Sequence, residues 1–291
     1  MIEIIPMKEK FGADIVGVDL AGCSDDDFDS IYRAWLDYGV LRFRGQELDE
    51  NGLQLFSQRF GPLEEMPYGR LPEELKKLIK NIYVTVISNI VVEGRPLGGL
   101  GSGESMWHSD MTYVDTPPPA SLLLAEEIPA KGGDTWFADQ YAAYDALPES
   151  LQKRIGNLAI KHDAAHNSVG ELRPGFEPID SPQSAPGAVH PIISTHSETG
   201  RKCLYLGRRE WAYVVGLELA ESEMLLDELW QYATLEENVV KQYWRVGDLI
   251  IWDNRCVLHR RDDIDPNDRR LLRRCQVLAR PDWWQHESRS S

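Results

Sequence analysis

Two histidines and one aspartate have the types and spacing that suit metal chemistry. His108 and Asp110 lie two residues apart in "WHSDMTY", and His259 follows the apolar stretch in "GDLIIWDNRCVLHRRDD". Residues two apart in a strand face the same side, so His108 and Asp110 can bind one ion together. Two His and one carboxylate on one face of an iron ion leave open positions for a cosubstrate and oxygen. The alternative is an ordinary hydrogen-bonded His-x-Asp pair on a strand, and the spacing alone leaves it open.

Two arginines follow the third histidine and suit anion binding. The segment "DDIDPNDRRLLRRCQVL" places Arg270 and Arg274 four residues apart, on one face of a predicted strand. Guanidinium groups on the inner face of a β core are costly unless each meets an anion. Arg is well suited to grip a carboxylate through two parallel hydrogen bonds. Arg269 and Arg273 then face solvent, although solvation of all four arginines on a sheet face remains the alternative.

The composition excludes several classes of partner. The chain has 291 residues, a formal net charge of −16 and a pI near 4.9, which disfavour binding to nucleic acid or to anionic membranes. No stretch approaches the length of an apolar membrane span. The four cysteines lack the spacing of a disulfide framework, which is typical of a reduced, cytoplasmic protein (Cys23, Cys203, Cys256 and Cys275). We therefore expect a cytoplasmic protein with a small-molecule substrate and no nucleic-acid or membrane partner.

The elements that must position these residues are mostly short strands. The segment 24–39 is predicted to be a helix, capped by Ser24 and ended by Gly39. From residue 105 onward, short β-branched or apolar runs alternate with Gly and Pro turns, and the run 249–252 is interpreted as a strand leading to His259. This pattern predicts a mainly β fold, a sandwich or jelly roll with flanking helices, in a single domain over 1–291. The Gly- and Pro-rich segment 167–188 is a candidate lid, and the tail 286–291 is expected to be disordered.

With these residues in view, the sequence resembles the taurine dioxygenase/2,4-dichlorophenoxyacetate dioxygenase (TauD/TfdA) family. The similarity runs over most of the chain through "GADIVGVDL", "YGVLRFRGQ", "FSQRFGPLE", "WHSDMTY", "GGDTWFAD", "GDLIIWDNRCVLHR" and "RRLLRR", in the family's order. The resemblance implies a double-stranded β-helix (jelly roll) with flanking helices, Fe(II) as cofactor, and 2-oxoglutarate and O2 as cosubstrates. It also implies a homodimer or homotetramer.

Residue by residue, the resemblance assigns His108, Asp110 and His259 to the iron. Thr135, in "GGDT", and Arg270 match positions that hold the distal carboxylate of 2-oxoglutarate. Arg274 matches a second arginine near the carboxylates of substrate or cosubstrate. The reaction implied is hydroxylation of a small anionic substrate, with or without later cleavage, and release of succinate and CO2. Desaturation and epimerisation use the same residues and stay open.

The substrate expected from the sequence is a small carboxylate. Sulfonate-oxidising members have a His soon after the "RFGPL"-like segment and an Asn four residues before the first iron His. Here "RFGPLEEMPYGR" has no His, and Glu104 stands at the second position. Glu104 is interpreted as meeting a cationic or hydroxyl group of the substrate, or as a solvated loop residue. Tyr113, Trp211 and Tyr213 are candidates for an apolar pocket around a carboxylate held by Arg274, or for ordinary core.

Two other classes of protein remain open at this stage. A zinc-dependent hydrolase can use the same three ligands with one open position, but it leaves Thr135 and Arg270 without a role. A non-catalytic β-sandwich binding module needs only the aromatic content and the acidic surface. The sequence does not identify the primary substrate, the position oxidised or the oligomeric state.

Overall fold

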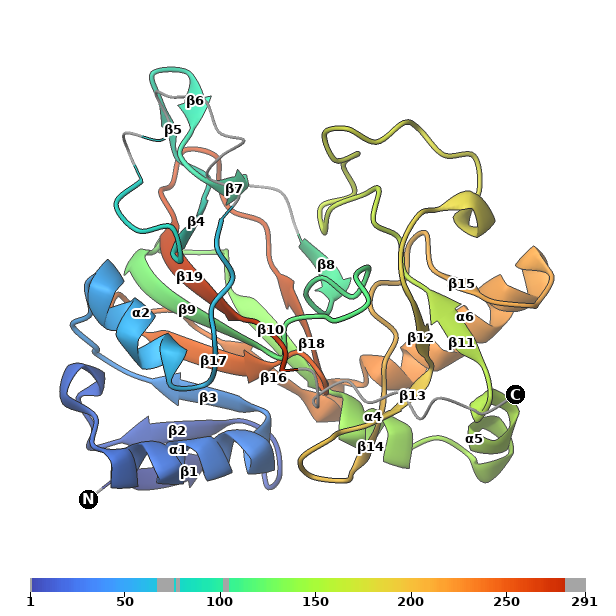
Figure 1. The fold of residues 1–291 in the computed structure, drawn as a ribbon, viewed down its shortest axis with the longest axis horizontal. Coiled ribbons are helices and arrows are strands. Elements are labelled where there is room, and N and C mark those ends of the chain that lie inside the picture. The colour runs from blue at the N-terminus through green and yellow to red at the C-terminus, as the bar shows by residue number, and fades with distance from the viewer. Residues whose placement is uncertain (1, 67–75, 77–78, 102–104, 281–291) are drawn as a thin grey trace.

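Figure 1 shows the chain in a computed structural model, which describes residues 2–66, 76, 79–101 and 105–280. Strands make up most of its elements, and the helices lie around them, so the expected mainly β fold with flanking helices is confirmed. Glu104 and the tail 286–291 lie outside the described residues. Within the described part of the chain, none of the helices combines the length and apolar composition needed to cross a membrane.

The larger sheet has eight strands in the order β1-β2-β3-β17-β9-β19-β4-β7. Its neighbours are antiparallel except for the parallel pairs β2–β3 and β4–β7. Its strands are β1 (Glu3–Pro6), β2 (Ala13–Val16), β3 (Val40–Phe43), β17 (Leu249–Asp253), β9 (Ala120–Glu127), β19 (Leu271–Val277), β4 (Thr85–Ser88) and β7 (Gly99–Leu100). Strands β17, β9 and β19 are buried along most of their length and form its centre.

The smaller sheet has four antiparallel strands in the order β16-β10-β18-β8. These strands are β16 (Val239–Gln242), β10 (Thr135–Asp139), β18 (Val257–Arg261) and β8 (Ser105–His108). The run 249–252 is a strand, as predicted, but it ends in a turn and belongs to the larger sheet. His259 lies on the next strand, β18, in the smaller sheet. The turn 254–256 between β17 and β18 therefore connects the two sheets.

Alternation along the central strands gives each face of the larger sheet its own apolar cluster. On one face, Leu122 and Leu124 of β9 pack against helices α1 (Asp25–Tyr38) and α2 (Glu50–Gln58). On the other face, Leu123 of β9 packs with Phe137 of β10 and Trp252 of β17, between the two sheets. The functional side chains described below project from this second face and from the facing strands of the smaller sheet.

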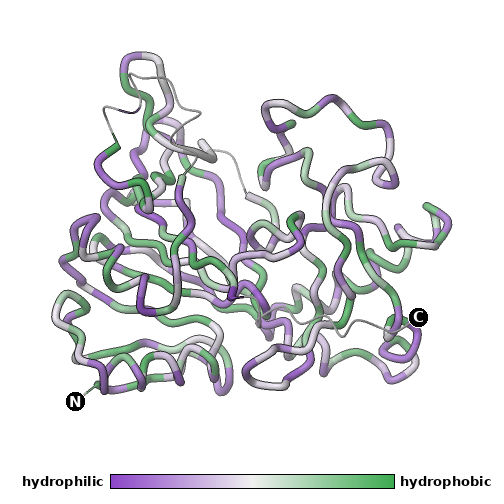
Figure 2. The backbone as a smooth tube through the Cα atoms, viewed as in Figure 1, coloured by the Kyte–Doolittle hydropathy of each residue, from purple (hydrophilic) through white to green (hydrophobic). Residues whose placement is uncertain are grey.

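Helix α1 begins and ends where its sequence predicts. The Ser24 side chain accepts a hydrogen bond from the Asp27 backbone N–H, and Gly39 adopts a left-handed conformation with φ of 69°. Hydrophilic and hydrophobic residues alternate along this helix, as Figure 2 shows at its lower left. The hydrophobic stripe, including Ile31 and Trp35, is buried against the larger sheet.

A third apolar cluster lies on the outer face of the smaller sheet. It joins β10 and β18 to helices α4 (Gln140–Asp145), α5 (Glu149–Ile155) and α6 (Leu219–Ala233). The remaining strands are short: β5 (Val91–Val92), β6 (Arg95–Pro96), β11 (Ala159–Lys161), β12 (Val189–Pro191), β13 (Ile193–Thr195), β14 (Lys202–Leu204) and β15 (Tyr213–Val214). The segment 167–188 runs from this region to the cavity between the sheets, where Asn167, Ser168 and Arg173 line the wall.

Candidate active site

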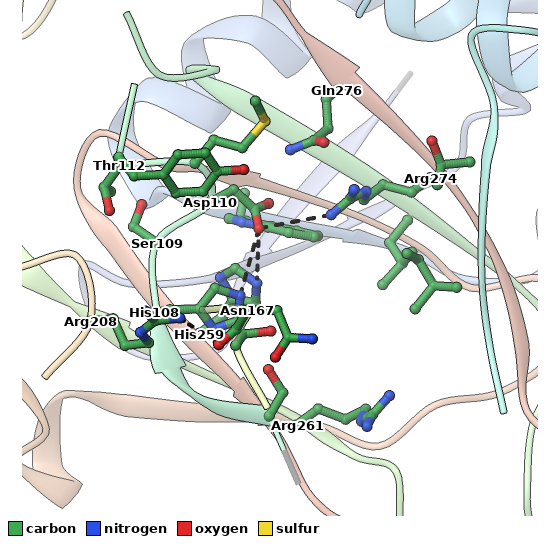
Figure 3. A pocket seen from close by; sticks show the side chains of 18 of the residues that line it. His108, Ser109, Asp110, Thr112, Asn167, Arg208, His259, Arg261, Arg274 and Gln276 are labelled. Atoms are coloured by element: carbon green, nitrogen blue, oxygen red, sulfur yellow. Dashed lines mark hydrogen bonds and ion pairs between the residues drawn. The ribbon is translucent and has the colours of Figure 1, made fainter. Parts of the chain in front are cut away.

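A cavity of about 540 Å³ lies between the two sheets. Strands β4, β9, β17 and β19 of the larger sheet line one side of it, and β8, β10 and β18 of the smaller sheet line the other. His108, Asp110 and His259 line it together with Thr135, Arg270 and Arg274, so residues predicted from distant segments meet in one place. Figure 3 shows the histidine rings below Asp110, with Arg274 beside its carboxylate.

The three predicted metal ligands form a tight group. Asp110 Oδ1 lies 3.6 Å from His108 Nε2 and 3.8 Å from His259 Nε2, and one ligand atom from each residue lies within 4.8 Å of the others. The two imidazole rings lie 4.1 Å apart, centroid to centroid. Their strands explain this proximity, because His108 and His259 are direct partners in the antiparallel pair β8–β18. The donor set and its one-sided arrangement fit a divalent metal ion of the iron type.

The reason predicted for the approach of His108 to Asp110 is wrong, although the two residues do meet. Strand β8 ends at His108, so Asp110 lies in the turn that follows and not two residues further along the strand. Ser109 turns inward in this turn and donates a hydrogen bond of 2.6 Å to the Asn254 carbonyl. Met111, the next residue after Asp110, has a φ of 50°, which is uncommon for a side chain of its size. The turn, rather than strand alternation, directs Asp110 toward the histidines.

Hydrogen bonds orient the ligand atoms toward the cavity. His108 Nδ1 lies 2.8 Å from the Met106 carbonyl, and since a carbonyl only accepts, this nitrogen carries the proton. His108 Nε2 is therefore left with its lone pair for a metal. Asp110 Oδ2 accepts a hydrogen bond of 2.7 Å from the Ser121 hydroxyl, which leaves Oδ1 toward the histidines. The orientation of two ligands is thus set before any ion binds.

The protonation states also suit a divalent cation. Burial lowers the pKa of His259 to about 3, with a further contribution from His108, so this imidazole is neutral near pH 7. Burial by itself raises the pKa of Asp110, but the nearby His259, His108 and Arg274 together hold it well below its usual range. Metal binding requires neutral imidazole and ionised carboxylate, and both are present here.

A second group of possible ligands, His196, Asp253 and Cys256, has a different character. Asp253 receives hydrogen bonds from His196 Nε2 at 3.0 Å and from the Arg255 guanidinium at 2.7 Å. Arg255 also pairs with Glu198 at 2.6 Å. These protein partners neutralise the carboxylate, so this buried group beside the turn between β17 and β18 does not need an ion.

Arg270 and Thr135 lie together on the cavity wall. Arg270 is only 1% exposed, and among the described residues its Nε has no hydrogen-bond partner and its guanidinium has no ion pair. Burial, followed by repulsion from Arg261, lowers the pKa of Arg270 to about 9. Thr135 Oγ1 accepts a hydrogen bond of 3.0 Å from Trp244 Nε1, which leaves the hydroxyl proton of Thr135 for another acceptor. These two side chains can bind an anionic group that enters the cavity.

Arg274 lies closer to the metal ligands, and its guanidinium is 3.8 Å from Asp110 Oδ1. Glu64, also on the wall, has a raised pKa because of its burial, and Arg274 partly opposes this effect. Arg273 points the other way and pairs with Glu126 at 3.0 Å, while the exposed Arg269 pairs with Glu127. Arg269 faces solvent as predicted, whereas Arg273 is only partly exposed, about as much as Arg274, because Glu50 and Glu126 pair with it.

The predictions for aromatic residues are partly wrong. Tyr113 lines the cavity, where Arg173 of the segment 167–188 lies 4.0 Å from its ring. Trp211 instead stacks on His166, and the Tyr213 hydroxyl donates to the Leu217 carbonyl; neither residue is on the cavity wall. Both belong to the segment between β14 and α6, whose position relative to the cavity depends on tertiary packing.

Sequence reasoning missed several residues of the wall. Four of them are Glu64, Ser105, His162 and Arg261. One of them had a signal in the sequence that was not used, because Arg261 lies two residues after His259, and two such residues share a face when the segment is a strand, as β18 is. The other three come from segments without a local pattern that indicates a cavity.

Comparisons with known proteins agree with this site. The sequence pattern of the family described as "Taurine catabolism dioxygenase TauD, TfdA family" matches residues 3–276. An (S)-phenoxypropionate/alpha-ketoglutarate-dioxygenase of Sphingobium herbicidovorans is 34% identical over 96% of both chains. An alpha-ketoglutarate-dependent 2,4-dichlorophenoxyacetate dioxygenase of Cupriavidus pinatubonensis is 35% identical over 94% of this chain and 96% of its own. The solved structure of AAD-2 with Mn(II) and N-oxalylglycine has a TM-score of 0.76 and 27% identity, covering 98% of this chain and 100% of its own.

Proposed function

The chain belongs to the TauD/TfdA family of α-ketoglutarate-dependent dioxygenases, which use Fe(II), 2-oxoglutarate and O2, and we propose that it oxidises a C–H bond of a small carboxylate. His108, Asp110 and His259 are the proposed iron ligands, and Arg270 with Thr135 is the proposed site for the distal carboxylate of 2-oxoglutarate. The comparisons lend no support to a zinc hydrolase that uses the same three ligands.

The bound cofactors supply the oxidation, and the protein supplies position and protonation state. Iron with 2-oxoglutarate and O2 provides the oxidising equivalent for a substrate C–H bond, and succinate and CO2 are released. Asp110 Oδ1 and the Nε2 atoms of both histidines would hold the iron at the cavity wall. Buried walls around this position, including Trp252 with its ring 4.8 Å from that of His259, exclude bulk water from the reacting groups.

The observation that carries the substrate class is the position of Arg274. Its guanidinium lies 3.8 Å from the Asp110 carboxylate, on the cavity wall, and its Nε has no partner among the described residues. A carboxylate bound in the fork of Arg274 has its adjacent carbon atoms next to the metal position. The two relatives named above act on phenoxypropionate and 2,4-dichlorophenoxyacetate, and both of these compounds are carboxylates.

The rest of the wall suits an apolar group on the same substrate. Met66, Tyr83, Ile87 and Tyr113 line the cavity, so aryloxyalkanoates are the first compounds to test. The segment after "RFGPL" contributes Glu64 and Met66 to the wall and no His, which supports a carboxylate rather than taurine. Hydroxylation is the proposed outcome. Desaturation and epimerisation remain alternatives that product analysis separates.

Several features of the architecture belong to the same proposal. The two facing sheets form the double-stranded β-helix core of a single domain over 1–291, and the chain assembles as a homodimer or homotetramer. The segment 167–188 acts as a lid, since its Arg173 already contacts Tyr113 on the cavity wall at 4.0 Å. Light scattering tests the oligomeric state. Limited proteolysis of the segment 167–188, with and without 2-oxoglutarate, tests the lid.

The main test begins with anaerobic addition of Fe(II) and 2-oxoglutarate, followed by visible absorption. We expect a weak charge-transfer band in the wild type and none in His259→Ala. Carboxylates, sulfonates and amino acids are then screened for succinate release. With the best carboxylate, Arg274→Met is expected to raise KM at least about tenfold, because a charge-assisted bidentate contact is lost.

Arg273→Met is the matched control for this variant. It removes a neighbouring guanidinium that pairs with Glu126 on the opposite face of the same strand, so it should leave KM within about twofold of the wild type. A wild type without the band contradicts the cofactor assignment. Equal KM values in the two arginine variants contradict the proposed substrate subsite and leave the cofactor assignment intact.

A further inference from the structure

Three side chains form a row across the larger sheet, next to the proposed metal site. Ser121 on β9 is the register partner of Trp252 on β17 and of Gln276 on β19. Residues directly opposite each other on neighbouring strands share a face of the sheet, and Trp252 and Gln276 both line the cavity. Figure 3 shows Gln276 and the two histidines on opposite sides of the Asp110 carboxylate. The pairing of three strands therefore places the buried Ser121 hydroxyl next to Asp110.

A hydrogen bond from Trp252 fixes the orientation of the Asn254 side chain. The indole N–H can only donate, and it lies 2.8 Å from the Asn254 amide, so the oxygen atom Oδ1 faces it. The nitrogen atom Nδ2 then faces Ser121 and donates to Oγ at 3.1 Å. Gln276 Nε2 donates to the same Oγ at 3.4 Å. Two amides therefore donate to Ser121, and both contacts use lone pairs of its oxygen atom.

The Ser121 hydroxyl has one direction left for its own proton. Since Oγ accepts from Asn254 and Gln276, its O–H donates to Asp110 Oδ2, at 2.7 Å. Ser121, Asn254 and Trp252 are all buried, so bulk water does not compete for these hydrogen bonds. Oδ2 is thereby held in the sheet, and Oδ1 is the oxygen atom that faces the two histidine nitrogen atoms.

We propose that Trp252, Asn254 and Ser121 form a hydrogen-bond relay that makes Asp110 bind the metal through Oδ1 alone. This inference rests on the proposed function. A carboxylate that bound through both oxygens would lose the charge-assisted bond from Ser121 and would occupy a position needed by the cosubstrate or oxygen. The relay also keeps Oδ1 from turning toward the Arg274 guanidinium, 3.8 Å away, which stays available for the substrate. Ser121 and Asn254 are positioning residues, because they act through Asp110.

The test measures the Kd of Mn(II) for the metal-free protein by calorimetry. Ser121→Ala should raise this Kd about 10- to 100-fold, the usual cost of removing a hydrogen-bond donor to a ligating carboxylate. Asn254→Ala should raise it by about two- to tenfold, because the Ser121 proton is then free to turn away from Asp110. Ser121→Thr keeps the hydroxyl group and should recover most of the affinity that Ser121→Ala loses.

Ser57→Ala is the matched control. Ser57 is as buried as Ser121, but it lies on α2, which covers the other face of the larger sheet. This variant should bind Mn(II) within about twofold of the wild type, and urea denaturation of the metal-free proteins compares the stability of the variants.

Equal Mn(II) affinity of the wild type and Ser121→Ala overturns the inference. An equal loss in Ser57→Ala and Ser121→Ala also overturns it, because that result indicates a general loosening of the fold. If Ser121→Ala does not fold, Asn254→Ala decides by the same comparison with Ser57→Ala. A wild type that binds no Mn(II) contradicts the proposed metal site instead.

Discussion

His162 is buried on the cavity wall without any hydrogen-bond partner for either ring nitrogen among the described residues. Burial, followed by the nearby His190 and Arg208, holds its pKa well below the usual value, so the ring is neutral in the folded protein. In the unfolded chain it regains its ordinary pKa near 6.5. The unfolded state therefore binds more protons than the folded state at pH values below about 6.5.

This difference predicts how stability changes with pH. The free energy of unfolding does not depend on the titration of His162 above about pH 6.5. As the pH falls below this value, the unfolded chain takes up the proton, and the free energy of unfolding decreases by up to about 1.4 kcal/mol per pH unit for each such histidine. His259 changes the free energy of unfolding with pH in the same direction, because burial also lowers its pKa. We expect His162→Phe to reduce the slope of unfolding free energy between pH 5 and 6.5, measured by urea denaturation. An unchanged slope in a folded His162→Phe variant would show that His162 is protonated in the native state.

At the scale of elements, the connection after β14 brings a glycine against His162. Gly207 has a φ of 68°, and its carbonyl accepts a hydrogen bond of 3.0 Å from the Ser109 backbone N–H, next to the proposed ligand Asp110. A Cβ atom at this position would lie 2.0 Å from His162 Nδ1 and 2.7 Å from Thr112 Oγ1. The backbone can therefore approach the cavity wall only because the residue is glycine.

We predict that Gly207→Ala lowers the free energy of unfolding by about 2–4 kcal/mol, because it adds a buried clash to the cost of a left-handed alanine. Gly200→Ala is the matched control: its φ of 70° is nearly the same, but nothing lies within 4 Å of its Cβ. That variant should lose only about 1–2 kcal/mol. Urea denaturation of both variants checks the difference. An equal loss of unfolding free energy in the two variants would mean that the residues around Gly207 move to accommodate a methyl group at little cost.

For the whole molecule, the two sheets bring the side chains of the proposed metal site from distant parts of the chain to one cavity. Binding of a metal ion and 2-oxoglutarate in this cavity therefore requires the native arrangement of both sheets. Compounds that bind only the folded state stabilise it by mass action. We predict that Mn(II) with 2-oxoglutarate at one hundred times its Kd stabilises the protein by about 2.7 kcal/mol. A chelator should abolish the effect, and His259→Ala should not show it.

Thermal or urea unfolding with and without these ligands measures the stabilisation. Arg260→Met serves as the control, because it leaves the cavity intact and should retain the full effect. Stabilisation of His259→Ala equal to that of the wild type would place the metal somewhere other than the proposed site.

The sequence by itself determined the features that depend on neighbouring residues. Ser24 and Gly39 delimit α1 through capping and a left-handed turn, and both act within a few residues of the helix. The mainly β fold follows from the pattern of short apolar runs and turns, and the residue types of His108, Asp110 and His259 suggested a metal site. The family resemblance added the cofactors, which residue spacing alone could not name.

The tertiary structure decided which residues share the cavity, because strand register and turns connect segments far apart in the chain. It directed Asp110 by a turn rather than by strand alternation, and moved His259 into a different sheet from the run 249–252. It also brought Ser105, Thr135 and Arg261 together through pairing of β8, β18 and β10. Hydrogen bonds between strands set these positions, and a shift of one residue would turn each side chain to the opposite face.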